Sequence, residues 1–287
     1  MANTMNAGVH KEDYAVKLQE RLNKPANWKE VADVIFSDTY IFNLPYMSTE
    51  FSAQTGTRGT AYSFSDFALT NDTLTVSSKK VVPVFVDRAD MAQISYVSQM
   101  ETAERQGALL SDVIETAMLA DHANWTDVGD VAGVVTSGNT TQFTVSATNI
   151  DDIVRGIRRI ITVANGEEQA NRNGIFFVWR PADFEALEQF AQANGFNLAD
   201  SALKSGIDKG YHLLGADHYV SNSHTANHVF AGVKKIFKIG ILRTTWGQIV
   251  VTQDPSLQSG TGIIARADYG VLTPAGLSSI LYDVNVV

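Results

Sequence analysis

The sequence contains no cysteine among its 287 residues. Without a thiol, the chain cannot form disulfides, use a thiolate nucleophile, or hold zinc or iron–sulfur clusters through cysteine. Charged residues are also scarce: they make up 18% of the chain, against roughly 25% in ordinary domains. A surface poor in charge indicates extensive contacts between subunits. The formal net charge is -9, which argues against a domain built to bind nucleic acid through Lys and Arg.

Long hydrophobic runs are absent as well. The run that comes nearest to a membrane span is VVPVFV, residues 81–86, whereas a bilayer-spanning helix needs about 18 apolar residues. The first residues lack the apolar core of a signal peptide. We therefore expect a soluble protein, with 45% hydrophobic residues supplying a core for one large or two smaller domains.

The N-terminal part of the sequence predicts one short helix, over residues 10–25. Tyr14, Leu18 and Leu22 recur at four-residue spacing, and Pro25 ends the pattern. A single apolar stripe on so short a helix needs a surface to dock against. We predict that these three residues make the contact of an N-terminal arm.

A polar segment follows, at residues 47–78, rich in Ser, Thr and Gly and without helical periodicity. It predicts an extended hairpin with a tip at Thr55, Gly56, Thr57, Arg58 and Gly59. The alternative is a disordered loop, since about 30 residues without regular structure are unusual inside a compact domain. Scattered aromatic residues favour a segment that docks on a neighbour.

The strongest helical pattern covers residues 101–124, where apolar residues form one face. Its apolar face consists of Leu110, Val113, Ile114, Ala117 and Met118. Such a helix is about 36 Å long and spans a whole domain. The strand pattern before it contains Pro83, which predicts an edge strand or a bulge.

The second half of the chain alternates helices and strands. We predict an amphipathic helix over residues 147–165, a buried strand in GIFFVW, and a helix that begins at Pro181 and ends at Gly195. The rest is mostly strand. A second projecting tip is predicted at Asp254, Pro255, Ser256, Leu257 and Gln258, because this segment is full of turn-forming residues. The fold class is therefore α+β, with two extended appendages.

Motifs of catalysis and cofactor binding are weak. GTGIIA, residues 260–265, matches a dinucleotide fingerprint, but a turn precedes it and a strand pattern follows it, so we expect no nucleotide site. Four histidines fall within residues 211–230: His212, His218, His224 and His228. Their spacing has no helical frame, so we predict polar loop residues and no metal, cofactor or catalytic site.

The order of these elements resembles the major capsid proteins of tailed bacteriophages, those with the Hong Kong 97-type fold. The matching pieces are an N-terminal arm, a long polar hairpin loop, the LTVSSKKVVPVFVDRADM entry into a long spine helix and the WTDVGDVAGVVTSG segment after it. The GIFFVWRPADFEAL junction, GYHLLGADHYVSNS and the closing GIIARADYGVLTPAGLSSILYDV complete the resemblance.

The resemblance implies a division of the chain into four parts. Residues 1–48 form the N-terminal arm and residues 49–78 the extended hairpin loop. Residues 79–130 and 244–270 form a peripheral domain with the spine helix, and residues 131–243 and 271–287 an axial domain. The arm and the hairpin loop would reach across neighbouring subunits, and the tip at residues 254–258 would meet other capsomers.

The resemblance also implies the function. Copies of the chain would form hexamers and pentamers of an icosahedral shell around double-stranded DNA, in a virion assembled in the host cytoplasm. Its partners would be other copies, a separate scaffolding protein, a portal and possible decoration proteins. The hairpin loop has no Lys, so covalent cross-linking from it is not expected. The alternatives are an encapsulin-type compartment, with Leu18 and Leu22 docking cargo, and a soluble α+β hydrolase.

Overall fold

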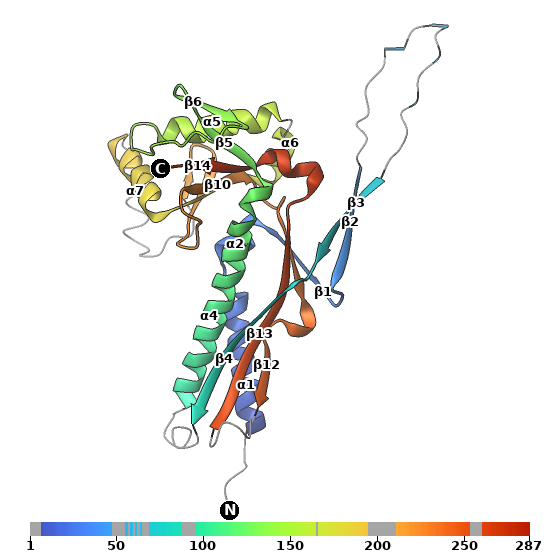
Figure 1. Ribbon diagram of the computed structural model, residues 1–287, viewed down its shortest axis with the longest axis vertical. Helices are drawn as coiled ribbons and strands as arrows, with labels where there is room; N and C mark the ends of the chain where they lie inside the picture. Colours follow the sequence, from blue (N-terminus) through green and yellow to red (C-terminus); the bar gives the residue numbers. More distant parts are fainter. Residues whose placement is uncertain are drawn as a thin grey trace, which may run out of the picture.

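The computed structural model describes residues 7–47, 55–56, 58–59, 61, 64, 69–87, 96–164, 166–194, 211–252 and 260–287. It confirms the α+β class. A five-stranded sheet lies alongside a long helix, α4 (Tyr96–Ala120), and a seven-stranded sheet lies at the C-terminal end of that helix (Figure 1). A third, two-stranded sheet forms a ribbon that leaves the body of the molecule.

The five-stranded sheet is organised around one strand, β13 (Gly260–Leu272). All ten residues of β4 (Ser78–Asp87) pair with one edge of β13, while β12 (Gln248–Thr252) and β11 (Lys238–Leu242) pair in turn with the other. β1 (Asp33–Ser37) adds to β11 in parallel. Among the described strands β4 pairs with β13 alone, which confirms the edge position that its proline predicted.

The seven-stranded sheet has the order β6-β5-β14-β10-β7-β9-β8, with parallel pairing at β5/β14 and β7/β9. Its inner strand β7, between β10 and β9, is buried at every position, as GIFFVW predicted. The seven strands are β5 (Thr126–Val131), β6 (Val134–Ser137), β7 (Ile175–Trp179), β8 (Tyr211–Leu213), β9 (Ala216–Val220), β10 (His228–Val233) and β14 (Leu281–Asn285).

Three helices pack on the seven-stranded sheet or on one another: α5 (Ile150–Val163), α6 (Glu167–Asn173) and α7 (Pro181–Ala193). Asn149 is the N-cap residue of α5, and Pro181 opens α7 at its first position, as predicted for that helix. Helix α6 was not predicted, because its seven residues are mostly polar and show no apolar period. Short 3-10 turns complete the set: η1 (Asp121–Asn124), η2 (Arg243–Thr245) and η3 (Ala275–Ile280).

Helix α4 joins two hydrophobic clusters. Leu110 packs in the smaller cluster, with α1 (Ala7–Asn23) and the inner face of the five-stranded sheet. Ile114 and Met118 lie one and two turns further on, in the larger cluster that extends into the seven-stranded sheet. A fully buried aliphatic side chain contributes about 1.5–3 kcal/mol. The predicted apolar face of the spine helix is thus confirmed. Through this face, α4 packs against both sheets.

The boundaries between sheets differ from the expected division of the chain. β1 and the short α2 (Asn27–Val31) belong to the folded body, although residues 1–48 were expected to form an arm. β11 belongs to the five-stranded sheet, although residues 131–243 were assigned to the other domain. The reason is a turn after β10, where Lys235 has φ 62 and the chain leaves one sheet for the other.

A bilayer-spanning helix is not found in the described part of the chain: none of its helices is both long and apolar enough.

Candidate functional site

The projecting ribbon consists of β2 (Ile41–Met47) and β3 (Leu69–Thr75), paired antiparallel from Ile41 opposite Thr75 to Met47 opposite Leu69 (Figure 1). This confirms the predicted hairpin, and its pairing starts earlier than residue 49. The paired strands β2 and β3 project away from both sheets (Figure 1).

The base of the ribbon is anchored by two glycines that face each other across β11 and β13, Gly240 and Gly270. A Cβ at Gly240 would overlap the Leu74 side chain, and a Cβ at Gly270 would overlap the Thr75 carbonyl. Because glycine has no side chain at these two positions, the end of β3 can lie directly against the sheet. Leu74 and Val76 are buried there, so the base of the ribbon packs into the body of the subunit.

The structure describes four of the five predicted tip residues of the ribbon. Thr55, Gly56, Arg58 and Gly59 are all exposed, and Gly59 has φ +86, a conformation that favours glycine. Thr57 lies outside the described residues. The second predicted tip, from Asp254 to Gln258, also lies outside them. It connects the antiparallel strands β12 and β13.

The predicted stripe on the N-terminal helix is buried within the subunit. Tyr14 is 3% exposed and Leu18 and Leu22 are 0% exposed, all packed in the cluster with α4, β12 and β13. The Tyr14 hydroxyl donates to Gln106 Oε1 at 2.5 Å, and burial raises the pKa of Tyr14 to about 12. The surface that this stripe needed is the chain's own spine helix, so these three side chains are not free to contact a neighbour or a cargo.

The outer face of the five-stranded sheet, on the side away from α1 and α4, carries an exposed apolar surface. Val81 and Phe85 of β4 are 53% and 49% exposed, and Val250 of β12 is 42% exposed. Ile264 of β13 lies between them, opposite both Pro83 and Val250. We call this set the outer apolar face. Sequence reasoning missed it, because alternation within each strand does not show which side a helix covers.

The four clustered histidines do not form one site. His212 is exposed on β8 and its Nδ1 lies 2.7 Å from Asp217 Oδ1 on β9. Lys234 Nζ lies 2.5 Å from Asp217 Oδ2. Burial would raise the pKa of Asp217, but the hydrogen bonds from Lys234 and His212 outweigh it and lower that pKa. Asp217 thus links β9 to His212 on β8 and to Lys234, the residue after β10.

His218 is fully buried on β9, which corrects the expectation that it is a loop residue. Its Nδ1 accepts a hydrogen bond from Trp179 Nε1 at 2.9 Å, and its Nε2 donates to the Leu213 carbonyl at 3.1 Å. Burial lowers its pKa to about 4, so it is neutral at pH 7. His224 lies in the predicted turn between β9 and β10, stacked on Phe230, and burial lowers its pKa to about 4 as well.

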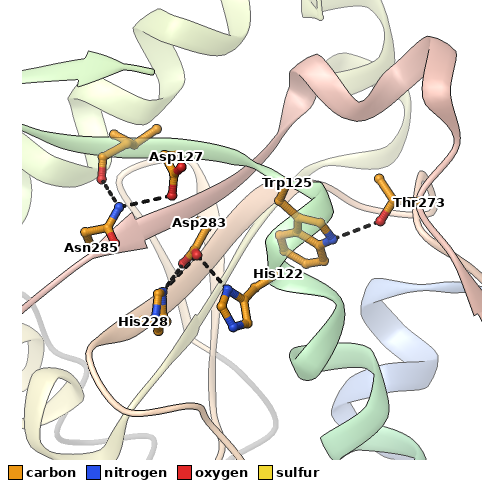
Figure 2. Close-up of polar contacts among 8 residues, drawn as sticks. His122, Trp125, Asp127, His228, Thr273, Asp283 and Asn285 are labelled. Carbon is orange, nitrogen blue, oxygen red and sulfur yellow. Dashed lines mark hydrogen bonds and ion pairs between the residues drawn. The ribbon is translucent and has the colours of Figure 1, made fainter. Parts of the chain in front are cut away.

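His228 belongs to a different group, with His122 and Asp283 (Figure 2). It is the first residue of β10, which also corrects the loop expectation, and His122 comes from η1 at the end of the spine helix. Asp283 lies on the central part of β14. Both histidine Nδ1 atoms approach the same carboxylate: His122 at 2.9 Å from Oδ2, and His228 at 2.8 Å from Oδ2 and 2.9 Å from Oδ1.

Neighbouring polar contacts hold this group in place (Figure 2). Trp125 Nε1 donates to Thr273 Oγ1 at 3.0 Å, as Figure 2 shows. Thr273 Oγ1 in turn donates to Asp121 Oδ2 at 2.6 Å. Asn285, two residues after Asp283, donates from Nδ2 to Asp127 Oδ1 at 3.3 Å. We call His122, His228 and Asp283 the histidine cluster. It lies where the spine helix meets the seven-stranded sheet, and no sequence signal joins His122 to His228, 106 positions apart.

The GTGIIA motif lies inside β13, which continues to Leu272. The helix that a pyrophosphate site requires after the glycines is replaced by strand, as the sequence predicted.

Solved capsid structures share this fold. A capsid chain of an empty GTA particle aligns with a TM-score of 0.63 and 15% identity, over 91% of this chain and 90% of that one. A chain of Mycobacterium phage Che8 aligns with a TM-score of 0.59 and 16% identity, over 86% and 85%. A virus-like particle from Pyrococcus furiosus gives a TM-score of 0.57 and 9% identity, over 96% and 99%.

No protein-family model and no curated protein sequence matches the chain. At identities of 9% to 16%, the likeness establishes the fold. The chain has the fold of phage capsid subunits, the Hong Kong 97-type fold that its element order resembled.

Proposed function

We propose that this chain is a major capsid protein, whose copies assemble as hexamers and pentamers into an icosahedral shell that encloses double-stranded DNA. The observation that carries the proposal is the alignment with a GTA capsid chain over 91% of this chain and 90% of that chain. So high a coverage leaves no unmatched stretch as long as a domain in either chain.

The described surface supports assembly through two features. The ribbon of β2 and β3 stands away from the body, and the outer apolar face exposes Val81, Phe85 and Val250. Rings are closed by head-to-tail interfaces, in which one surface of a subunit meets a different surface of the next. A projecting ribbon and an uncovered sheet face supply two such unlike surfaces.

The proposal assigns roles to the parts of the subunit. The five-stranded sheet with α1 and α4 is the peripheral domain, the seven-stranded sheet is the axial domain, and the ribbon is the extended hairpin loop. Contacts with neighbours are made by the tips at Thr55 to Gly59 and Asp254 to Gln258. The partners are other copies of the chain, a separate scaffolding protein, a portal and decoration proteins, in a virion assembled in the host cytoplasm.

The proposal gives DNA no sequence-specific site and the chain no catalytic role. A net charge of -9 suits an inner wall that does not adhere to packaged DNA. An encapsulin-type compartment would use the same fold, but the Leu18 and Leu22 side chains that could dock cargo are buried against the chain's own α4. Nuclease-protected DNA inside purified shells supports the capsid, whereas a protein cargo without DNA supports the compartment.

The ribbon provides the direct test of assembly. We would delete residues 52–60, bridge the gap with Gly-Ser, and measure both thermal unfolding and shell formation by electron microscopy with scaffold co-expressed. We expect the midpoint of unfolding to stay near that of the native chain, because loop closure depends weakly on length. We expect shells to be lost, because about 1 kcal/mol per contact is repeated around each ring.

A matched control replaces the same nine residues with nine Gly and Ser residues, which keeps the length and removes the side chains. Shell formation by this control together with failure of the deletion would show that reach is what matters. Normal shells from the deletion itself would contradict the role of the ribbon, and a native chain that stays monomeric with scaffold present would contradict the proposed function.

A further inference from the structure

The histidine cluster brings together two imidazoles and one carboxylate from three separate elements (Figure 2). The ligand-capable atoms of His122, His228 and Asp283 all lie within 4.8 Å of one another. Within the described residues, this is the one group of three or more such side chains that meets this condition. The two rings are 4.2 Å apart between centroids and tilted by 34°. Both therefore face the carboxylate from the same side.

Two imidazole nitrogens and one carboxylate oxygen form a ligand set that suits zinc and its neighbours in the first transition series. Zinc binds such atoms at about 2.0 to 2.2 Å, which places tetrahedral ligands about 3.3 Å from one another. The Nδ1 atoms lie 2.8 and 2.9 Å from Asp283 Oδ2. Side-chain rotation that separates these atoms by about half an ångström opens a coordination site of the right size.

Burial and charge also favour a cation at this position. The Asp283 side chain is 2% exposed, and the side chains of His122 and His228 are 20% and 22% exposed. The carboxylate is thus inside, while the histidines border solvent, from which water can supply a fourth ligand. Asp127 pairs with Asp283 across β5 and β14, which adds a second carboxylate to this face of the sheet.

We propose that His122, His228 and Asp283 bind one divalent transition-metal ion of the zinc class, with water completing the tetrahedron. The ion ties the end of the spine helix, through η1, to β10 and β14 of the seven-stranded sheet. It would thereby fix the spine helix relative to that sheet. The spacing of the histidines within residues 211–230 predicted no metal site, but the histidine that lies beside His228 is His122, outside that segment.

The competing arrangement is a hydrogen-bonded triad without metal, in which each Nδ1–H donates to Asp283. Both arrangements use the same three side chains, so a loss of stability on mutating one of them would not distinguish a metal site from a metal-free triad. They differ in stoichiometric metal binding and in its spectroscopic signature. They also differ in ion preference, because magnesium prefers oxygen ligands and does not replace zinc at imidazole.

The test uses the full chain after dialysis against a chelator. Cobalt(II) is titrated first, because its visible absorption reports tetrahedral coordination, and zinc is then added in competition. We expect one cobalt per chain, displacement by one zinc, no displacement by magnesium, and a higher thermal midpoint with zinc.

Variants locate the site. His122→Ala removes a partly exposed ligand from a 3-10 turn, and His228→Gln provides a second variant with a similar side-chain size. Each should weaken zinc binding by at least about 100-fold, since the loss of an outer partner alone costs 10- to 100-fold. The matched control is His212→Ala, which removes an exposed histidine paired with Asp217 and should leave zinc affinity unchanged.

Absence of stoichiometric cobalt or zinc binding by the native chain would overturn the metal site and leave the hydrogen-bonded triad. Unchanged affinity in both His122→Ala and His228→Gln would overturn its location. Because the measurement is made on the subunit, its outcome is independent of whether the chain forms shells. A metal-free subunit that assembles normally would refute this inference and leave the proposed function intact.

Discussion

The two main sheets differ in how completely their own chain covers them. In the seven-stranded sheet every residue of β7 and β14 is buried. In the five-stranded sheet the inner face is covered by α1 and α4, while the outer apolar face leaves Val81, Phe85 and Val250 exposed. These two inner strands of the first sheet are therefore fully covered within one subunit, although Val134 on its outermost strand β6 is exposed. The second has an apolar face that, under the proposed function, neighbouring subunits cover.

The largest expected effect concerns the core of the seven-stranded sheet. Phe177 is fully buried and stacked on Trp179, with ring centroids 5.3 Å apart. Phe177→Ala should lower the free energy of unfolding by about 4 kcal/mol, from lost burial and the cavity left behind. Urea unfolding followed by circular dichroism measures this. Val163→Ala, at a 77% exposed position on α5, is the control and should change stability little. A loss below about 1 kcal/mol for Phe177→Ala would show that this core is loosely packed.

A smaller effect follows from the buried His218. Its pKa is about 4 in the folded chain and about 6.5 when unfolded. Between these values the unfolded chain binds more protons, so the free energy of unfolding falls as the pH decreases from about 6.5 to 4. One histidine contributes a loss of at most about 3 kcal/mol over that window. Urea unfolding at a series of pH values measures it.

His218→Asn removes this titration and keeps an oxygen that can accept from Trp179 Nε1, so its stability should depend less on pH. His212→Ala removes an exposed histidine and should leave the steep pH dependence in place. If His218→Asn lost stability with acid as steeply as the native chain, the neutral buried histidine would not be the cause.

The smallest effect on stability is expected on the five-stranded sheet. Phe85→Ser should change the free energy of unfolding by no more than about 0.5 kcal/mol, because the side chain is half exposed. It should nevertheless reduce shell formation, measured by sedimentation and electron microscopy. Val134→Ser, at an equally exposed position on the other sheet, is the matched control and should spare both. Equal loss of shells in the two variants would remove the distinction between the sheets.

Local patterns were enough to predict several elements. Four-residue spacing predicted the stripe of Tyr14, Leu18 and Leu22, and the apolar run predicted β7, because burial of one face or of a whole strand leaves its period in the sequence. Sequence did not show that the stripe packs on α4 of the same chain. A stripe specifies that a helix must dock, and it carries no information about the chain that supplies the surface.

Non-local pairing explains the remaining differences. The long strand-like stretch from residue 228 to 243 divides between two sheets, because a single positive-φ residue, Lys235, redirects the backbone. The histidine cluster depends on the position of η1 relative to β14, which is set by how the spine helix meets the sheet. Neither is encoded in the spacing of neighbouring residues.

Strand β13 has a mechanical consequence for the subunit. It runs through the five-stranded sheet and is bonded to β4 along ten residues on one side, with β12 and then β11 on the other. A tensile load along its axis would have to shear these ladders together, since no single pair carries it alone. β1, bonded only to β11 among the described strands, could instead be peeled away one pair at a time. Under a load along β13, we therefore expect the ladders on both sides of β13 to resist together, and β1 to detach before them.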